Sequence, residues 1–294
     1  MRVLVTGASG GIGSAVVPEL LAAGHQVVGL ARSERAAATI VAAGAEPLHG
    51  ALDDLDGLRA AAQQVDGVIH LAFGNDFSNI QANVDEESAA VAALGGALVG
   101  SGKPFVLAGG TPAVPGRLST EADPALIDGP LAGRGRTAQL VLDLAQQGVR
   151  SGVVRLPRSV HAGTGRYGFA SVLIAAAQRS GAAGYVGDGS QRWPAVHQAD
   201  AARLFRLVLE QGEPGTVAHA VGDEGDTMRS LTEAIGARLG VPVQQVPAES
   251  YGFLGTVFVV DQPSSSARTR ERFGWDPTHP SLLDDLAHGE YPEA

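Results

Sequence analysis

Short apolar runs alternate with longer segments through the first half of the chain. The short runs are bounded by glycine or proline, which is typical of strands buried on both faces of a sheet. The longer segments have the spacing of amphipathic helices. Strands separated by helices predict a doubly wound α/β fold, a parallel sheet covered on both faces. The expected strands are 2–7, 25–32, 46–50, 67–73, 103–110 and 150–157, and the expected helices are 11–23, 33–43, 54–64, 84–100 and 134–147.

Beyond residue 160 the alternation becomes less regular. Helix-like pieces flank a glycine-rich stretch that has strand character, and residues 228–240 have the period of an amphipathic helix. We therefore expect a regular region at 1–160 and a smaller region at 161–294. Part of 190–222 is expected to return to the main sheet.

The composition narrows the class of protein. Hydrophobic residues make up 45% of the 294 residues and charged residues 18%, which favours a large core over disorder. No apolar run approaches the roughly 18 residues of a membrane span, and because the start "MRVLVTG" leads straight into a strand pattern we expect no signal peptide. Because cysteine is absent, there is no disulfide and no thiol nucleophile. We expect a cytoplasmic protein with no metal centre, and the net charge of −10 disfavours nucleic acid.

The basic residues are almost all arginine. Lysine occurs once among the 21 basic residues, at Lys103. None of the four tyrosines is followed by a lysine four positions later. A Tyr-x-x-x-Lys pair is therefore impossible anywhere in this chain.

A glycine-rich loop, "VTGASGGIGSAV", connects the first expected strand to the first expected helix. Glycine is needed in such a loop because the turn is tight and the backbone must approach a pyrophosphate closely. The following helix presents its N-terminus to the anion. The loop therefore predicts a dinucleotide site, and the residues expected to line it are Gly7, Ser9, Gly10, Gly11, Ile12 and Gly13.

This loop resembles that of the short-chain dehydrogenase/reductase superfamily. Because Gly10 and Gly11 are adjacent, the sequence satisfies both T-G-x-x-G-x-x-G, found in extended or atypical members, and the alternative T-G-x-x-x-G-x-G. The blocks "VVRLP", "GDGSQRWPAVHQADAARL" and "FGWDP" resemble the later part of extended and atypical members. The resemblance implies a Rossmann domain at 1–160 and a substrate-binding region at 161–294.

The end of the second expected strand bears on the choice of cofactor. A carboxylate there would hold the ribose 2′-hydroxyl of NAD, but the sequence reads "GLARSERA", with Arg32 at that position and Ser33 and Arg35 close by. An arginine offers several donors to a phosphate. We therefore predict NADP as the cofactor, the alternative being a solvated surface arginine that tolerates NAD.

The resemblance implies further neighbours of the cofactor. Leu52 and Asp53 would flank the adenine, and Asp53 would alternatively, or in addition, cap the helix that begins near 54. Small residues at the end of the fourth strand would lie against the nicotinamide ribose, and His70 just before them is expected to be a core histidine. The residues implied near the nicotinamide end are Leu71, Ala72, Phe73, Pro157 and Val160.

The catalytic tyrosine and lysine of the superfamily are missing. By resemblance, Thr111 would take the place of the serine or threonine that bonds the substrate oxygen, or would be an ordinary loop residue. Pro130 would fall near the tyrosine position and Arg134, or else Arg136, near the lysine position. A guanidinium can bind ribose hydroxyls or stabilise an oxyanion, but its pKa above about 12 makes it a poor proton donor. The proton must come from another group or from water.

Candidates for substrate contact follow the sixth strand. Arg158 would bind substrate, while His161 and Tyr167 are candidates for acid–base work because they lie where extended members bring substrate and nicotinamide together. Trp193 would cover the substrate pocket or pack the two regions together, and His197 is a further substrate candidate. Each of these side chains alternatively serves structure alone. Asp200 is expected to cap the helix that follows it.

Three functions fit these observations. The first is an NADPH-dependent reductase of a carbonyl or imine in a small, largely apolar molecule. The second is a sensor that binds NADP without catalysis, like the NmrA-type regulators that resemble this superfamily. The third and weakest is a nucleotide-sugar epimerase or dehydratase, because those enzymes use the missing tyrosine. The expected partner is a small-molecule substrate, and the alanine-rich helix near 84–100 would pack on its own sheet or in a homodimer.

Overall fold

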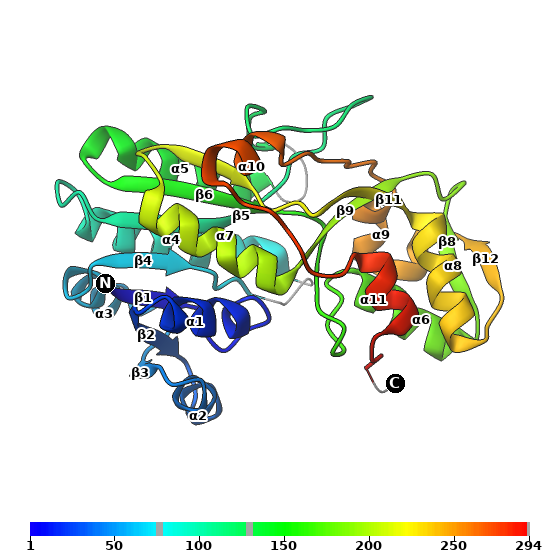
Figure 1. Ribbon diagram of the computed structural model, residues 1–294, viewed down its shortest axis with the longest axis horizontal. Helices are drawn as coiled ribbons and strands as arrows, with labels where there is room; N and C mark the ends of the chain where they lie inside the picture. The colour runs from blue at the N-terminus through cyan, green and yellow to red at the C-terminus, as the bar shows by residue number, and fades with distance from the viewer. Residues whose placement is uncertain (75–78, 128–131, 293–294) are drawn as a thin grey trace.

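A computed structural model describes residues 1–74, 79–127 and 132–292. Its main element is a seven-stranded sheet in the order β10-β6-β5-β4-β1-β2-β3, in which every neighbouring pair is parallel (Figure 1). This confirms the predicted doubly wound Rossmann fold. The strands are β1 (Arg2–Thr6), β2 (Gln26–Ala31), β3 (Glu46–His49), β4 (Gly67–His70), β5 (Pro104–Gly110), β6 (Arg150–Leu156) and β10 (Thr216–His219).

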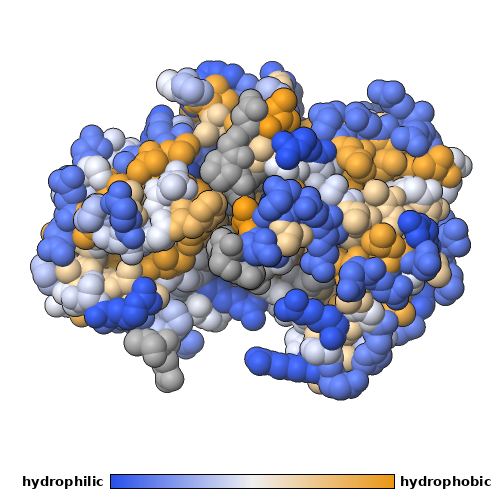
Figure 2. Space-filling view, turned by 180° about the vertical axis from the view of Figure 1, so that it is seen from behind, coloured by the Kyte–Doolittle hydropathy of each residue, from blue (hydrophilic) through white to orange (hydrophobic). Residues whose placement is uncertain are grey.

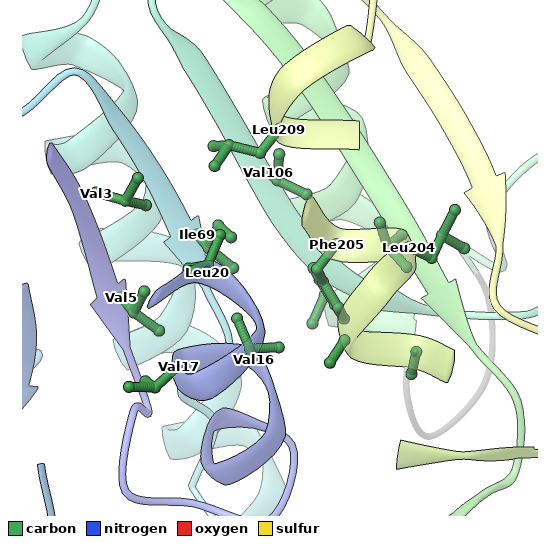
Figure 3. Close-up of a cluster of buried hydrophobic side chains, with 14 of the residues drawn as sticks. Val3, Val5, Val16, Val17, Leu20, Ile69, Val106, Leu204, Phe205 and Leu209 are labelled. Carbon is green, nitrogen blue, oxygen red and sulfur yellow. The ribbon is translucent and has the colours of Figure 1, made fainter. Parts of the chain in front are cut away.

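Helices cover both faces of this sheet. One face packs against α1 (Gly13–Ala22), α2 (Glu34–Ala42) and α7 (Gln198–Gln211). Figure 3 shows side chains of α1 near Val5 of β1 and side chains of α7 near Val106 of β5. The opposite face packs against α3 (Leu55–Gln63), α4 (Ile80–Ala97) and α5 (Ala132–Asp143), and α5 is followed by the short helix η2 (Leu144–Gln147).

The first strand shows why the apolar runs are continuous. Val3 and Val5 belong to the core on one face, whereas Leu4 belongs to the core on the other, and all three are fully buried. Successive side chains of a strand point to opposite faces, so a strand covered on both sides needs apolar residues at every position. Burial of each such side chain contributes about 1.5–3 kcal/mol.

The second half of the chain forms a smaller body beside the sheet (Figure 1). It contains a third hydrophobic core, in which Tyr167, Trp193 and Phe258 are among the buried residues. Its strands are β7 (Ser159–His161), β9 (Arg192–His197) and β11 (Asp223–Thr227) in one sheet and β8 (Ala183–Val186) and β12 (Val243–Val246) in another. Its helices are α6 (Ala170–Ser180), α8 (Met228–Leu239), η3 (Ala248–Leu254), α9 (Gly255–Phe258) and α11 (Leu282–His288). Helix α10 (Ala267–Phe273) packs instead against α7 and β10 of the large body.

The division between the two bodies does not follow the chain strictly. After β9 the chain returns to the large body, where α7 covers the main sheet and β10 pairs with β6. It then enters the smaller body again at β11. Because β7 to β9 lie between two elements of the large body in the chain, and β11 follows them, the smaller body is an insertion into the Rossmann sheet as well as an extension of it.

The outer surface is mixed in character. Seen from behind, it is mostly hydrophilic, with hydrophobic patches near the boundary between the two bodies (Figure 2). Lys103 lies just before β5, at the amino ends of the parallel strands, and its Nζ donates a hydrogen bond to the carbonyl of Gln63. Among the described residues, no helix has both the length and the hydropathy to cross a membrane.

Candidate functional site

A cavity of about 970 Å³ opens at the carboxyl ends of the parallel strands. Its walls come from the residues that follow β1, β4, β5 and β6, and from α6 and the α9 region of the smaller body. Open α/β sheets bind ligands at this edge, at the point where the strand order reverses. Here the reversal lies between β1 and β4. The cavity is therefore the candidate site.

The glycine loop forms one end of the cavity, and Gly7, Ser9, Gly10, Gly11, Ile12 and Gly13 all line it. Gly7 has a φ of 69°, and a β-carbon there would lie 2.9 Å from the backbone nitrogen of Ala72. A β-carbon at Gly13 would overlap the carbonyl oxygen of Gly7. Helix α1 begins at Gly13, and the preceding Ile12 makes no side-chain cap. The loop therefore leaves backbone N–H groups at the helix N-terminus for an anion, which fits the pyrophosphate of a dinucleotide.

Thr6 fixes the neighbouring wall of the cavity. Its Oγ1 accepts hydrogen bonds from the backbone N–H groups of Leu71 (3.2 Å) and Ala72 (3.3 Å). Leu71, Ala72 and Phe73 line the cavity directly after β4. The threonine before the glycine loop therefore sets the position of the segment that was predicted to adjoin the nicotinamide.

His70 lies behind this wall and is fully buried. Its Nδ1 is 2.9 Å from Thr6 Oγ1, and its Nε2 has no hydrogen-bond partner among the described residues. Burial lowers the pKa of His70 to about 3, and the nearby charge of Arg134 acts in the same direction. His70 is thus a neutral core histidine and not an acid facing the cavity.

This burial predicts a pH dependence of stability. The pKa of His70 is lower in the folded than in the unfolded chain, so its contribution is complete above about pH 6.5 and is lost progressively as the pH falls toward 3. We expect that His70→Asn reduces the loss of unfolding free energy between pH 6 and pH 4 by about 1 kcal/mol per pH unit. Urea unfolding at several pH values measures it, with the exposed His49→Asn as the matched control; an unchanged slope contradicts the prediction.

The other end of the cofactor region contains Arg32 and Leu52, which both line the cavity. Arg32 is exposed and follows β2 directly. Ser33 is not part of the described lining, and its hydroxyl caps α2 by accepting a hydrogen bond from the N–H of Ala36.

Asp53 was predicted to flank the adenine, to cap the next helix, or both. It does not belong to the described cavity lining. The N-cap of α3 is the next residue, Asp54, whose carboxylate accepts from the N–H of Gly57 at 3.0 Å. The prediction that Asp53 caps α3 is therefore wrong by one residue. The sequence was ambiguous here because Asp53 and Asp54 are adjacent and either could serve as the cap.

Arg134 lines the cavity from the first turn of α5. Its guanidinium donates to both carboxylate oxygens of Glu87 (2.9 and 3.3 Å) and to the carbonyl of Ala108 (2.9 Å). The same group lies over the ring of Phe73, 4.3 Å from its centre. These contacts fix the guanidinium, and its Nη1 makes no hydrogen bond to the described residues. Arg134 is therefore a preorganised donor at the cavity wall.

Glu87 is the acid that holds this arginine, and it is almost completely buried. Burial raises the pKa of Glu87, and the charge and hydrogen bonds of Arg134 oppose that shift. Arg136 points elsewhere: it donates to the carbonyl of Ile127 and does not line the cavity. Of the two arginines proposed for the lysine position, Arg134 is the one that the cavity includes. Pro130 lies outside the described residues.

Thr111 and Arg158 both line the cavity and are joined by Gln262. The side-chain amide of Gln262 donates to both the carbonyl and the hydroxyl oxygen of Thr111. Its carbonyl oxygen accepts from Arg158 Nη2 at 2.8 Å. The Thr111 hydroxyl therefore accepts from Gln262 and keeps its own hydrogen for a further acceptor.

Pro157, Val160 and Tyr167 also line the cavity, as predicted for the nicotinamide end and the acid–base candidates. The Tyr167 hydroxyl, however, donates to the backbone carbonyls of Asp285 (3.2 Å) and Glu290 (2.9 Å) and is fully buried. Burial raises its pKa above the usual value. Tyr167 thus anchors the end of the chain, and its role as an acid has no support from its hydrogen bonds.

His161 does not belong to the described cavity lining. It is buried, with Nδ1 paired to Asp285 at 2.7 Å and Nε2 without a partner among the described residues. His197 packs edge-on against it and stacks on His279, with ring centres 4.5 Å apart. Neither histidine reaches the cavity, so their predicted roles in proton transfer and substrate contact stay untested predictions.

Asp200 was expected to cap α7, and this is wrong: the cap is His197, whose Nδ1 accepts from the N–H of Ala199. Asp200 instead accepts from the backbone of Thr278 and His279 and pairs with His279 Nδ1. Ligand atoms of His197, Asp200 and His279 lie within 4.8 Å of one another. Because the Asp200 oxygens already accept hydrogen bonds from Thr278 and His279, this cluster has a structural role: it connects the start of α7 to the segment around residue 279.

Trp193 packs the smaller body. It is fully buried, its ring centre lies 4.7 Å from that of Phe258, and Arg158 lies over its face at 5.0 Å. Trp193 does not belong to the described cavity lining, whereas Arg158 does, and Trp193 packs within the core of the smaller body. Its predicted roles in covering the substrate pocket or packing the two regions together stay predictions.

No local signal in the sequence marks Gln262 or Glu87. Gln262 follows an irregular segment 151 residues away from Thr111, and Glu87 lies within an ordinary helical pattern. The functional importance of Glu87 follows from its burial in the structure, because a buried carboxylate needs a partner.

Comparison with known proteins supports this reading of the fold. The family model for the NAD dependent epimerase/dehydratase family matches residues 3–221. The uncharacterized protein C2A9.02 of Schizosaccharomyces pombe is 43% identical over 297 residues, covering 99% of this chain and 100% of that protein. The 4-hydroxy-2-methyl-3-oxo-4-farnesyl-3,4-dihydroquinoline-1-oxide ketoreductase of Stigmatella aurantiaca is 30% identical over 271 residues, covering 85% and 79%.

A solved structure has the same architecture over nearly the whole chain. DesIV, a dTDP-glucose 4,6-dehydratase from Streptomyces venezuelae with NAD and TYD bound, has a TM-score of 0.78 at 22% identity and covers 98% of this chain and 95% of its own. The fold and the match over 3–221 confirm the resemblance drawn from the glycine loop. The chain therefore belongs to the NAD dependent epimerase/dehydratase family.

Proposed function

We propose that this chain is an NADPH-dependent reductase of a carbonyl or imine in a small, largely apolar molecule. The observation that carries the proposal is one continuous cavity, which joins the glycine loop and Arg32 to a chamber lined by apolar residues of the smaller body, including Phe169, Val172 and Val257. The related protein of Stigmatella aurantiaca that is named a ketoreductase supports reduction over epimerisation.

The residues present fit a dinucleotide. The backbone of the glycine loop and the uncapped N-terminus of α1 would hold the pyrophosphate, and Arg32 would hold a 2′-phosphate. Leu71, Ala72 and Val160 would enclose the nicotinamide end. When bound, NADPH supplies hydride to the substrate carbon.

Two donors of this chain would act on the substrate oxygen or the cofactor ribose. Arg134 is held by Glu87 and the carbonyl of Ala108, so its Nη1, which has no partner among the described residues, needs no reorganisation to bind a developing negative charge. Thr111 retains its hydroxyl hydrogen because Gln262 is its donor. Neither group is a strong acid, so the proton that completes reduction would come from water entering the cavity.

The cofactor preference gives a direct test. We expect NADPH to bind at least about tenfold more tightly than NADH, because a charged hydrogen bond from Arg32 contributes about 1.5–3 kcal/mol. Arg32→Ala should remove the preference, whereas Arg35→Ala, which changes an exposed arginine outside the described cavity lining, should preserve it. Fluorescence titration of both cofactors measures this. Equal affinities in the wild type would exclude NADP as the specific cofactor, and a preference that survives in Arg32→Ala would exclude Arg32 as the residue that causes it.

The reaction itself is tested by NADPH consumption with a panel of aldehydes, ketones and imines. A specific observation keeps the sensor alternative open: Tyr167 is the one tyrosine in the described cavity lining, and its hydroxyl is bound to two carbonyls. Tight NADPH binding without turnover of any carbonyl or imine would favour the sensor over the reductase.

A further inference from the structure

Arg158 is a buried cation that forms no ion pair with any acid in the described part of the chain. It follows β6, lines the cavity and is 7% exposed. Only Nη2 has a partner among the described residues, the neutral side chain of Gln262. The Nε and Nη1 atoms of Arg158 are buried and have no hydrogen-bond partner among the described residues. Buried arginines are normally paired, because a desolvated charge without hydrogen bonds is costly.

The charge of Asp261 acts on Arg158 but does not pair with it. Among the described residues, Asp261 is the carboxylate whose charge raises the pKa of Arg158, but it is hydrogen-bonded to the backbone and guanidinium of Arg192. Burial lowers the pKa of Arg158 to about 10, so the group is still a cation at neutral pH. The Trp193 ring beneath it stabilises a cation but provides no acceptor for its N–H groups.

The surroundings of Arg158 define what would satisfy it. The chamber next to it is apolar, with Phe169, Val172, Leu254 and Val257 in its wall. The cavity as a whole is lined by five arginines and by Glu86 as the one acid of its described lining, although the chain carries a net charge of −10. A cation at the end of an apolar chamber selects a ligand with a negative head and an apolar body.

We infer that Arg158 binds a carboxylate of the substrate, so that the substrate class is an oxo acid with an apolar body. The inference rests on the proposed reductase function and deepens it. The carboxylate would accept from the unpartnered Nε–H and Nη1–H groups, and the apolar body would fill the chamber toward α6 and α9. The oxo group would lie toward Thr111 and Arg134.

The test measures binding without chemistry. Aliphatic monocarboxylates and their primary amides, which carry no reducible carbonyl, are titrated calorimetrically into the protein saturated with NADP⁺. We expect each carboxylate to bind roughly 10- to 100-fold more tightly than its amide, because the hydrogen bonds to Arg158 are charge-assisted at both ends. Arg158→Met should abolish this difference and Arg158→Lys should keep part of it. Arg179→Met, which removes an exposed arginine at the end of α6, should retain it fully.

The outcomes separate this inference from the reductase proposal. Equal affinity for carboxylates and amides in the wild type overturns the inference, as does a preference that persists in a folded Arg158→Met variant. If Arg158→Met fails to fold, the wild-type comparison and Arg158→Lys decide the matter. Preferential carboxylate binding, with no oxo acid reduced by NADPH, would support the anion site and overturn the reductase.

Discussion

Replacement of Arg134 by alanine is expected to lower kcat/KM for carbonyl reduction by roughly 10- to 1,000-fold, the range observed when one preorganised donor is lost. The guanidinium lies at the cavity wall and is already oriented by Glu87, Ala108 and Phe73. Arg134→Lys should recover part of the activity if the positive charge alone is sufficient, and little if the planar guanidinium with its several donors is required. Steady-state kinetics with saturating NADPH measures the effect.

The control is on the same helix. Arg136→Ala removes an identical side chain two residues later that faces Ile127 outside the described cavity lining, and it should leave kcat/KM within about twofold of the wild type. Arg134→Ala also leaves Glu87 buried without its partner, at a cost on the order of 3 kcal/mol in stability. Thermal melting of Arg134→Ala and Arg134→Ala/Glu87→Gln separates this loss from catalysis. Unchanged turnover in Arg134→Ala and in Thr111→Val would mean that the active site lies elsewhere.

Gly10→Val should abolish cofactor binding while the chain stays folded. A β-carbon at Gly10 would have one contact within 4 Å, with the Gly7 oxygen at 3.1 Å, so the backbone tolerates it with a small shift. The two methyl groups of valine would then occupy the cavity beside the loop. Calorimetric titration of NADPH together with far-UV circular dichroism tests both halves of the statement.

Two further glycines give the matched comparisons. Gly96→Val places the same side chain on the exposed surface of α4 with no atom within 4 Å, and it should bind NADPH as the wild type does. Gly13→Ala should instead destabilise the fold, because its β-carbon would overlap the backbone oxygens of Gly7 and Ala8. Normal NADPH affinity in Gly10→Val would mean that the glycine loop is not the cofactor site.

The fold could be predicted from the sequence because the sequence patterns that specify its elements are local. Continuous apolar runs, helical periods and the glycine loop each lie within about twenty residues, and each specifies one strand, one helix or one turn. The exact ends of the elements were predicted less well, because neighbouring residues can serve as alternative helix starts. Helix α4 begins at Ile80, before the expected residue 84, and the cap of α3 is Asp54.

The residues of the candidate site could be predicted from the sequence only where their position follows from the ends of the strands. Thr111, Arg134 and Arg158 follow or face particular strands, so the topology alone brings them to one edge of the sheet. The partners that orient them come from distant segments. Neither the pairing of Arg134 with Glu87 nor that of His161 with Asp285, 124 residues apart, is encoded by any spacing in the sequence.

The position of Lys103 makes the protein suited to selective labelling. It is the single lysine of the chain and lies at the amino end of β5, whereas the cavity opens at the carboxyl ends of the strands. Amine-reactive dyes or tethers directed at lysine side chains will therefore attach on the far edge of the sheet. Reagents that modify arginine will instead reach the groups proposed to hold the ligands. A surface tethered through Lys103 would present every molecule with its cavity facing solution.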